Sequence, residues 1–397
     1  MIACLETAPT ALLHWFLALL ASWGVPAWTL PFVSALIIIG VLLGVFLTLF
    51  ALTSVLERKI LARAQNRYGP NRVGPFGLFQ PVADGIKMLT KEDLVPRSAD
   101  QIVHFLAPVV MLIPALMVLA ILPYGRGMVP AELDAGILYF FALGAGTEVA
   151  VFMAGWSSNN KYSVLGAMRA IAQMISYELP LVMSAIVAAM VAGSLSPSAI
   201  VEAQGGFWAG VVPRWFVFTP WGFAAFLIFY IGALAEANRS PFDLPEGESE
   251  IVAGHLTEYS GFKYALFFMA EYVGMFAICG LMVTLFLGGW QAPLPFLDFV
   301  PTWAWFLAKI CFVAFTMVWV RATLPRLRID HLMAFAWKFL LPMSFAAFFA
   351  AACWHFAGRG LAGWLVSLAI VGAPYLLLGG AFARRFAVSR RTYRFSQ

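Results

Sequence analysis

The sequence predicts an all-α integral membrane protein: a bundle of about nine transmembrane helices, with its N-terminus outside and its C-terminus in the cytoplasm. Hydrophobic residues make up 62% of the 397 and charged residues only 11%, whereas an ordinary soluble domain has about 25% charged residues. Apolar segments recur along the whole chain without a Ser- or Gly-rich linker. We therefore expect residues 1–397 to form a single membrane domain.

Nine apolar segments approach or exceed the roughly 20 helical residues that the hydrocarbon core of a bilayer requires. They are 31–56, 102–124, 137–156, 174–193, 219–236, 262–287, 302–320, 335–357 and 361–383. A further apolar stretch, 11–28, is interrupted by Gly24 and Pro26, and no charged loop separates it from the next segment. We expect this stretch to be a helix in the membrane interface, with a tenth span as the alternative.

Lysine and arginine residues indicate the orientation. Twenty of the 25 lie in or beside alternate loops, which include 57–101 and 237–261, or in the C-terminal tail. The other side holds only three, Arg126, Arg214 and Arg359. Because short cytoplasmic loops are enriched in Lys and Arg, the first set is predicted to be cytoplasmic. The basic tail is explained by this rule and by contact with anionic lipid, so nucleic acid is not an expected partner.

Apart from Lys263 at the very start of its segment, two lysines and four carboxylates lie within the predicted spans. An ionisable group at the centre of a membrane helix costs about 2.5–3.5 kcal/mol, so each requires a reason. We expect Lys338 to reach the headgroups and Lys309 to partner a carboxylate of another helix. The carboxylates occur in four different spans, at Glu148, Glu178, Glu236 and Glu271.

The depths of these carboxylates suggest a proton path. Glu148 and Glu271 are predicted near the middle of the bilayer, and Glu178 and Glu236 nearer the cytoplasmic ends of their spans. A carboxyl group in a low-dielectric environment can exchange protons near neutral pH, so four of them favour a path for protons. The alternative is that each reaches the headgroups or forms a hydrogen bond between helices.

The loop after the first span begins with basic residues and has many turn-forming residues between Gln65 and Pro75. An amphipathic stretch follows, with apolar residues on one face and charged residues on another: Leu78, Val82, Ile86 and Leu89 against Asp84, Lys87 and Lys91. This pattern predicts a helix in the interface, with its apolar side toward lipid or a lipophilic ligand. The alternative is a stop-transfer cluster followed by a surface helix.

The loop 237–261 is acidic on the side where topology favours basic residues. Two prolines, Pro241 and Pro245, precede a run that contains Glu246, Glu248 and Glu250. Such a run is either a solvated turn or an ordered surface that docks a partner or forms the mouth of a proton path. The density of prolines and carboxylates favours the ordered surface.

The cysteines are isolated, at Cys4, Cys279, Cys311 and Cys353, with no CxxC pair and no histidine at ligand spacing. The sequence therefore predicts no iron–sulfur cluster, zinc site or structural disulfide in this chain. The N-terminus has no basic segment before its apolar stretch and no evident cleavage site, so we expect no removable signal peptide.

Two long runs are specific enough to indicate a family. They are ERKILARAQNRYGPNRVGPFGLFQP, from Glu57 to Pro81, and EANRSPFDLPEGESEIVAGHLTEYSG, from Glu236 to Gly261. Two shorter runs, QMISYELPL from residue 173 and RATLPRLRIDHLM from residue 321, agree with them. Over about residues 31–357 the chain resembles the H subunit of NADH:quinone oxidoreductase, respiratory complex I. The last apolar segment, 361–383, resembles the extra C-terminal span of some family members.

The resemblance implies a membrane-arm subunit of a proton-translocating enzyme, expected in the inner (plasma) membrane of a bacterium, with the mitochondrial inner membrane as the alternative. Such a subunit carries no redox centre and no covalently bound cofactor. It forms much of the chamber through which a lipid-soluble quinone, the substrate, reaches an iron–sulfur cluster in a neighbouring subunit. NADH is bound by another partner. The implied partners are the quinone-site subunits of the peripheral arm, other membrane-arm subunits, quinone and membrane lipids.

The matching motifs assign residues to two paths. Those implied around the quinone path are Glu57, Arg58, Arg67, Asp84, Lys87 and Arg239. Those implied along the proton path are Glu148, Glu178, Glu236 and Glu271, with Glu246, Glu248 and Glu250 in the cytoplasmic loop.

Three other functions are compatible with the same residues. The chain could serve as the homologous membrane subunit of a hydrogenase or of a ferredoxin- or F420-dependent complex. It could be a stand-alone proton-coupled transporter, in which buried carboxylates are also expected. It could also be a passive scaffold, in which case neutralising Glu148 or Glu271 would leave activity unchanged.

Overall fold

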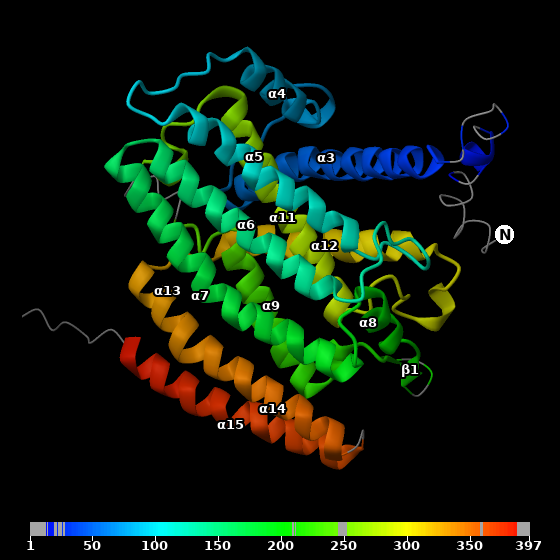
Figure 1. The fold of residues 1–397 in the computed structure, drawn as a ribbon. Helices are drawn as coiled ribbons and strands as arrows, with labels where there is room; N and C mark the ends of the chain where they lie inside the picture. Colours follow the sequence, from blue (N-terminus) through cyan, green and yellow to red (C-terminus); the bar gives the residue numbers. More distant parts are fainter. Residues whose placement is uncertain are drawn as a thin grey trace, which may run out of the picture.

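The computed structural model describes a helical bundle (Figure 1). The residues described are 28–208, 210, 212–244, 252–357 and 360–386, together with a few residues between 13 and 26. Within this part of the chain, the sheet consists of one small hairpin formed by β1 (Phe207–Trp208) and β2 (Val212–Pro213). The all-α prediction is therefore confirmed.

Among the residues that the structure describes, eight helical segments are long and apolar enough to cross a membrane. They are α3 (Leu30–Ala64), α5 (Gln101–Val118) with the 3-10 turn η2 (Leu119–Ile121), α6 (Gly136–Ser157), α7 (Lys161–Ala192), α11 (Gly261–Phe286), α12 (Thr302–Thr323), the continuous segment of α13 (Ile329–Phe335), the π-helical turn η6 (Ala336–Leu340) and α14 (Leu341–Ala357), and α15 (Leu361–Phe386). A ninth apolar helix, α9 (Pro220–Glu236), is shorter. These helices confirm a polytopic bundle, while its orientation and its treatment as a single domain stay predictions.

The remaining elements are short and connect these helices. They are α4 (Gln80–Thr90), α8 (Pro197–Ala203), and the 3-10 turns η1 (Pro75–Gly77), η3 (Phe216–Phe218), η4 (Gly254–Leu256) and η5 (Pro295–Leu297). The predicted interfacial helix at 11–28 lies largely outside the described residues, as do Cys4, Glu246, Glu248 and Glu250.

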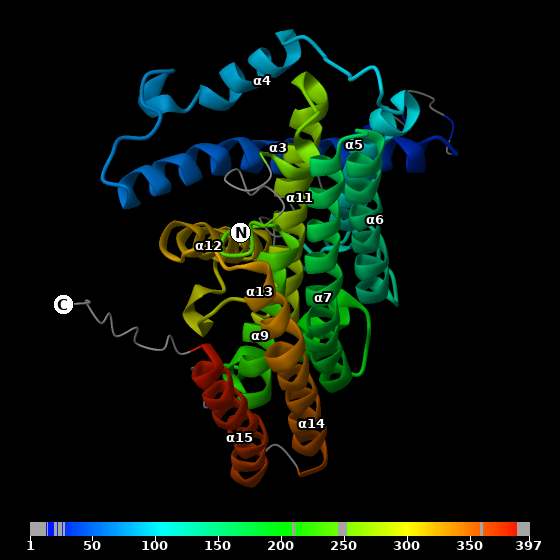
Figure 2. The same cartoon turned by 90° about the vertical axis from the view of Figure 1, so that its left-hand side faces the viewer.

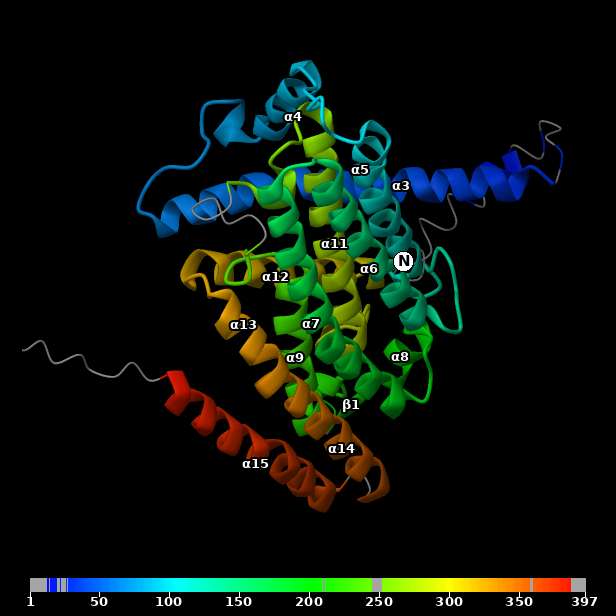
Figure 3. The same cartoon turned by 60° about the vertical axis from the view of Figure 1, so that its left-hand side comes forward.

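Helix α11 lies at the centre of the bundle. It packs on α5 along one side and on α12 along another, with further contacts to α3, α4, α8 and α9 (Figure 2). Its residues from Met275 to Phe286 are all buried. Helix α15 lies at the edge, where it packs on α14 and α9 (Figure 3). The central helix thus carries one of the predicted carboxylates, Glu271.

Helix α7 begins 13 residues before the predicted span 174–193, and this corrects the predicted position of Glu178. The Asn160 side chain accepts a hydrogen bond from the Tyr162 N–H and caps the helix, which ends at Gly193 in the left-handed conformation. The first turns of α7 contain polar residues, so hydropathy alone does not reveal them. Glu178 therefore lies near the middle of a 32-residue helix rather than near its end.

The prediction that Lys309 partners a carboxylate is wrong. Its ammonium group donates hydrogen bonds to the backbone oxygens of Leu287, Gly289 and Gln291, at 2.7, 2.8 and 2.7 Å. The same group lies 4.0 Å from the ring centroid of Trp215. Carbonyl groups at the end of a helix attract cations, so Lys309 satisfies the backbone where α11 ends.

Helix α4 carries the predicted amphipathic pattern. The side chains of Leu78, Val82, Ile86 and Leu89 are at least half exposed on this chain, although they are apolar. The start of α11 approaches the end of α4, since a Cβ atom at Gly261 would lie 3.3 Å from the Lys91 oxygen. The loop at 57–101 and the start of α11 therefore occupy the same end of the bundle, and the C-terminal end of α11 lies at the opposite end.

The two ends of the bundle are predicted to lie on opposite sides of the membrane, and cysteine labelling can test this. Single cysteines placed at Arg72 and Glu246 should be labelled only from the cytoplasm, and those at Gly127 and Pro293 only from outside, because basic residues gather on the Arg72 side. The measurement is labelling by a membrane-impermeant thiol reagent in intact cells and in inverted vesicles, after the native cysteines are replaced. Labelling of any position from the wrong side would contradict the nine-span arrangement.

A buried histidine predicts sensitivity to acid. His255 in η4 is 4% exposed, and its Nδ1 has no hydrogen-bond partner among the described residues. Burial lowers the pKa of His255 to about 4, whereas an unfolded histidine titrates near about 6.5. As the pH falls below about 6.5, the unfolded state binds the proton first. Through this residue, the free energy of unfolding should fall by about 2 kcal/mol by about pH 5.

We expect His255→Phe to reduce this loss. The measurement is the apparent melting temperature of the purified assembly at near-neutral pH and at about pH 5, which should differ less in the variant than in the wild type. His355→Phe makes the same change at an exposed histidine and should leave the difference unaltered. Equal acid sensitivity in His255→Phe and the wild type would contradict the assignment.

Candidate functional site

A buried carboxylate, Glu57, is the centre of an ion cluster inside the bundle. Its side chain is 3% exposed. The Arg239 guanidinium donates a hydrogen bond from Nη1 to Glu57 Oε1 at 2.7 Å, and Arg321 Nη1 donates to the same oxygen. The Tyr272 hydroxyl donates to the other carboxylate oxygen, Oε2, at 2.6 Å. Both oxygens of this carboxylate are therefore satisfied by groups from other parts of the chain.

Four separate elements bring these residues together. Glu57 lies on the C-terminal part of α3, Arg321 in the last turn of α12 and Tyr272 in the middle of α11. Arg239 lies in the turn after α9, where its N–H donates to the Leu234 oxygen at 3.1 Å. Because a buried charge is tolerated only when it is paired, the cluster also fixes the relative positions of these four elements.

Arg239 connects this cluster to a second carboxylate. Its Nε atom lies 3.8 Å from Glu271 Oε1, and its guanidinium carbon lies 4.1 Å from the ring centroid of Tyr272. Burial lowers the pKa of Arg239, but the neighbouring Glu271 and Glu57 carboxylates outweigh burial and raise its pKa above the usual value. Arg239 therefore stays charged, and its charge is shared between Glu57 and Glu271.

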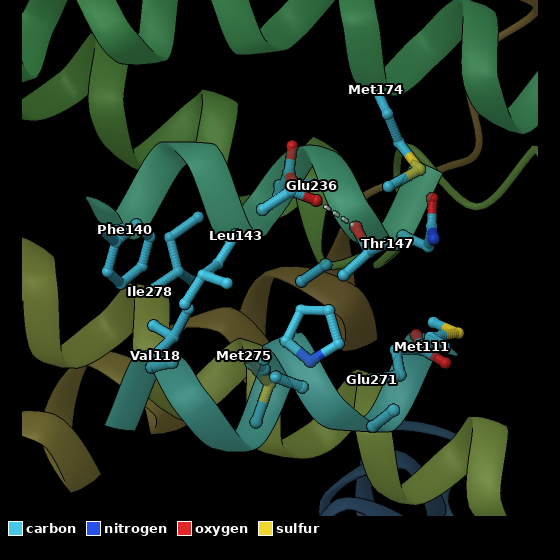
Figure 4. A pocket seen from close by; sticks show the side chains of 18 residues that line it. Met111, Val118, Phe140, Leu143, Thr147, Met174, Glu236, Glu271, Met275 and Ile278 are labelled. Carbon is cyan, nitrogen blue, oxygen red and sulfur yellow. Dashed lines mark hydrogen bonds between the residues drawn. The ribbon is translucent and has the colours of Figure 1, made fainter. Parts of the chain in front are cut away.

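A small cavity continues from Glu271 to Glu236. Its volume is about 80 Å³, and both carboxylate residues line it together with apolar residues of α5, α6 and α11 (Figure 4). Thr147 and Asn238 also line it. A water molecule in the liquid takes up about 30 Å³, so the cavity can hold a few water molecules between the two carboxylates.

Beyond this cavity, Glu236 interacts with two further carboxylates. Its side chain is mostly shielded from solvent, and the charges of Glu178 and Glu148 act on it. Glu148 and Glu178 also interact with each other. The four carboxylates predicted from separate spans thus form a series: the charges of Glu148 and Glu178 act on Glu236, and one cavity is lined by both Glu236 and Glu271.

Four of the residues implied around the quinone path lie away from the ion cluster. Arg58 forms an ion pair with Asp84 at 2.7 Å, which joins α3 to α4. Arg67 donates to the Gln65 side chain at 2.7 Å, and Lys87 is exposed on α4. The predicted quinone-path residues therefore separate into a buried group, Glu57 with Arg239, and an exposed group beside α4.

Arg321 and Tyr272 belong to the site, but neither was predicted as a site residue. Arg321 was counted only among the basic residues that indicate topology, although it begins the run RATLPRLRIDHLM. Tyr272 directly follows Glu271. A tyrosine in an apolar helix gives no signal by itself, because its ring is as suitable for packing as for hydrogen bonding.

The described residues contain no group of three or more His, Cys, Asp or Glu side chains that could hold a metal ion. Cys279, Cys311 and Cys353 are free thiols, and the Cys279 sulfur contacts the Met317 sulfur at 3.6 Å. The polar groups of the site are instead carboxylates, guanidinium groups and a phenol, which can carry protons and respond to nearby charge.

The fold and the site together define a class of protein: a multi-pass membrane protein with a series of buried and partly buried ionisable groups. A family model described as NADH dehydrogenase matches residues 37–352. The chain belongs to this NADH dehydrogenase family, and the resemblance found in the sequence is confirmed.

The relatives share one name, which identifies each as the H subunit of an NADH-quinone oxidoreductase. The relative from Dehalococcoides mccartyi is 50% identical over 79% of this chain and 85% of its own length. Those from Brevibacillus brevis and Geobacillus kaustophilus are 48% and 50% identical, over 81% and 77% of this chain and 92% and 89% of theirs. These relatives do not favour the hydrogenase, transporter or scaffold alternatives. The family match ends before α15, which lies outside residues 37–352.

Proposed function

We propose that this chain is the membrane subunit of a proton-translocating NADH:quinone oxidoreductase that joins the quinone-reduction site to a proton path. One observation carries the proposal: Arg239 contacts Glu57 on one side and Glu271 on the other. A change in charge or protonation near Glu57 would therefore change the electrostatic environment of Glu271 directly.

The proposed coupling uses this shared arginine. Reduction of a quinone creates negative charge at its oxygens until protons arrive, and this charge would attract the guanidinium groups around Glu57. Weaker pairing of Arg239 with Glu271 favours the neutral acid at Glu271, because an unpaired carboxylate in low dielectric is costly. The proton would come through the water-sized cavity from Glu236, to which Glu148 and Glu178 are connected. The acidic run Glu246, Glu248 and Glu250 would supply the cytoplasmic mouth of this path.

The proposed quinone path runs beside α4. The exposed apolar face of this helix forms one wall of the path, and charged residues lie next to that wall. The exposed side chains of Val82, Ile86 and Leu89 suit a lipophilic tail or the lipid from which it comes. The Arg58–Asp84 pair holds this helix next to α3. We propose a quinone as the substrate, with Arg67 and Lys87 beside its path.

The electron carriers are proposed to lie in partner subunits. The iron–sulfur cluster that reduces the quinone would belong to a peripheral-arm subunit that covers α4 and the loop 57–101, and the NADH site to another subunit. Membrane-arm subunits would receive the proton signal from Glu148 and Glu178. The proposed location is the plasma membrane of a bacterium.

Purification of the assembled complex tests this function. A tag on this chain should co-purify NADH-binding and iron–sulfur subunits, and the complex in liposomes should pump protons when NADH reduces quinone. Electron donation by hydrogen, ferredoxin or F420 instead of NADH would assign the chain to a related complex. Proton transport by the purified chain alone would assign it to the stand-alone transporters.

Arg58→Met should weaken the reaction with quinone without abolishing it. The change breaks the ion pair between Arg58 and Asp84, so α4 loses one attachment to α3. The Arg58 side chain of this pair is about half exposed. Exposed pairs contribute about 0.2–1 kcal/mol, and we expect the apparent KM for quinone to rise by about two- to fivefold. The measurement is NADH:quinone activity over a range of quinone concentrations, with an artificial hydrophilic acceptor for comparison.

The hydrophilic acceptor should be reduced at the wild-type rate, because it takes electrons before the quinone site. Arg72→Met replaces another exposed arginine of the same loop, which has no ion pair among the described residues, and should leave the KM unchanged. Loss of both activities in Arg58→Met would indicate failed assembly and would contradict a local role at the quinone path.

A further inference from the structure

A second cavity lies at the end of the bundle opposite to α4. Its volume is about 470 Å³, within the range of about 300–1,000 Å³ that is usual for small-molecule sites. Three separate connections form its walls: the turn at Arg126, the hairpin of β1 and β2, and the segment from Trp290 to Thr302. None of the residues assigned to the quinone or proton paths lines it.

Two basic residues lie at this cavity, although the predicted outer side of the membrane has few Lys and Arg residues. Arg126 lines the cavity. The Arg214 side chain lies 3.7–3.8 Å from the position of a Cβ atom at Gly206, another lining residue. These are two of the three basic residues in the predicted outer loops. Neither guanidinium has an ion pair or side-chain hydrogen bond within the described ranges. The two charges are therefore available to an anionic ligand.

The cavity is formed before any ligand arrives, because hydrogen bonds connect its walls. The Arg126 N–H donates to the Thr302 hydroxyl at 3.4 Å. The Gln291 side-chain amide donates to the Val201 oxygen, and the Gln291 oxygen accepts from the Lys309 ammonium group at 2.7 Å. Lys309 thus holds the cavity wall in place through its contact with the Gln291 oxygen.

Aromatic side chains surround the cavity in the manner of a membrane interface. Phe207, Trp290 and Trp305 line it. Phe296 and Phe299, in the same segment, are 71% and 58% exposed. Tryptophan and other aromatic residues gather at the level of the lipid headgroups, where one part of the ring is in hydrocarbon and another in water. A ligand in this cavity would therefore lie at headgroup depth.

We propose that this cavity binds the headgroup of a phospholipid. The phosphate would pair with Arg126 and Arg214, since guanidinium groups bind phosphate oxygens with paired hydrogen bonds. Asp298, which also lines the cavity, would accept a hydrogen bond from a hydroxyl or amine of the headgroup. The acyl chains would lie along the exposed aromatic residues. A bound lipid would then join the outer loops of α5, α8 and α11 to the membrane.

The test measures lipid retained by the purified complex. The complex is delipidated in detergent and incubated with phosphatidylglycerol or with phosphatidylethanolamine, and bound lipid is counted by native mass spectrometry. The variant carrying both Arg126→Gln and Arg214→Gln should retain one phospholipid fewer per complex than the wild type. Arg72→Gln, at the opposite end, should retain the wild-type number.

Asp298→Asn distinguishes the two headgroups. It should reduce retention of phosphatidylethanolamine more than that of phosphatidylglycerol if the carboxylate pairs with an amine. It should reduce retention of phosphatidylglycerol more if the carboxylate accepts from a headgroup hydroxyl, which phosphatidylethanolamine lacks. Equal lipid retention by the double variant and the wild type would overturn the proposal. Loss of a partner subunit from the double variant, with the lipid count unchanged, would assign the cavity to a protein and would overturn it too.

Discussion

Glu271→Gln is expected to assemble normally and to lose nearly all proton pumping, with quinone reductase activity lowered by about tenfold or more. The amide keeps the shape of the side chain and can accept a hydrogen bond, so the fold tolerates it. It cannot take up or release a proton. The small cavity between Glu271 and Glu236 would then hold water with an ionisable group at only one of its two ends.

Two further variants make this prediction specific. Glu271→Asp should retain more activity, because it keeps an ionisable group at a shorter reach. Glu202→Gln makes the same chemical change at an exposed position of α8 and should behave like the wild type. The measurements are proton uptake into liposomes and NADH:quinone turnover. Wild-type pumping by Glu271→Gln would leave Glu271 as a packing residue and remove it from the proton path.

Arg239→Lys is expected to lower coupled quinone reduction by about ten- to a hundredfold. Lysine keeps the positive charge, but it is a single point charge and lacks the planar group that contacts Glu57, Glu271 and the Tyr272 ring at once. The ammonium group can satisfy only one carboxylate well, so the other is left under-paired. The measurement is NADH:quinone turnover and the number of protons pumped per NADH.

The effect should depend on the connection between the carboxylates and not on charge alone. Arg321→Lys also replaces a planar guanidinium group that pairs with Glu57. Arg321 is 29% exposed, so water can replace part of the lost contact. It should therefore lower turnover less and leave the number of protons per NADH unchanged. Arg239→Met should fail to assemble, because losing one partner of a buried ion pair costs about 3–5 kcal/mol. Equal loss of coupling in both lysine variants would argue against a special role for Arg239.

Much of the fold is readable from hydropathy, because a membrane helix must be apolar over its length. The same rule marks Glu148, Glu236 and Glu271, since charge within an apolar segment is rare. Helix boundaries follow less well where a helix continues into polar sequence. The first turns of α7 are an example, and Glu178 is consequently deeper in its helix than expected.

The composition of the site is harder to predict, because it depends on contacts between distant residues. Glu57 is separated from Arg239 by 182 residues and from Arg321 by 264, and one sequence contains no record of such proximity. Lys309 shows the same difficulty in another form. Its partners are backbone carbonyl groups, which every residue has, so no pattern of side chains predicts them. The roles assigned to the site residues stay predictions until variants are measured.

The buried half of α11 acts as an electrical insulator for the proposed path. Beyond Glu271, the residues from Met275 to Phe286 are buried and almost entirely apolar, and the Thr284 hydroxyl donates to the Gly280 oxygen within the helix. A bare charge in such surroundings is strongly disfavoured. In the proposed path, a proton on Glu271 would therefore find no carrier along this half of α11, and the gradient would not leak back along this helix. The proton would instead move sideways, from Glu271 through Glu236 toward α6 and α7.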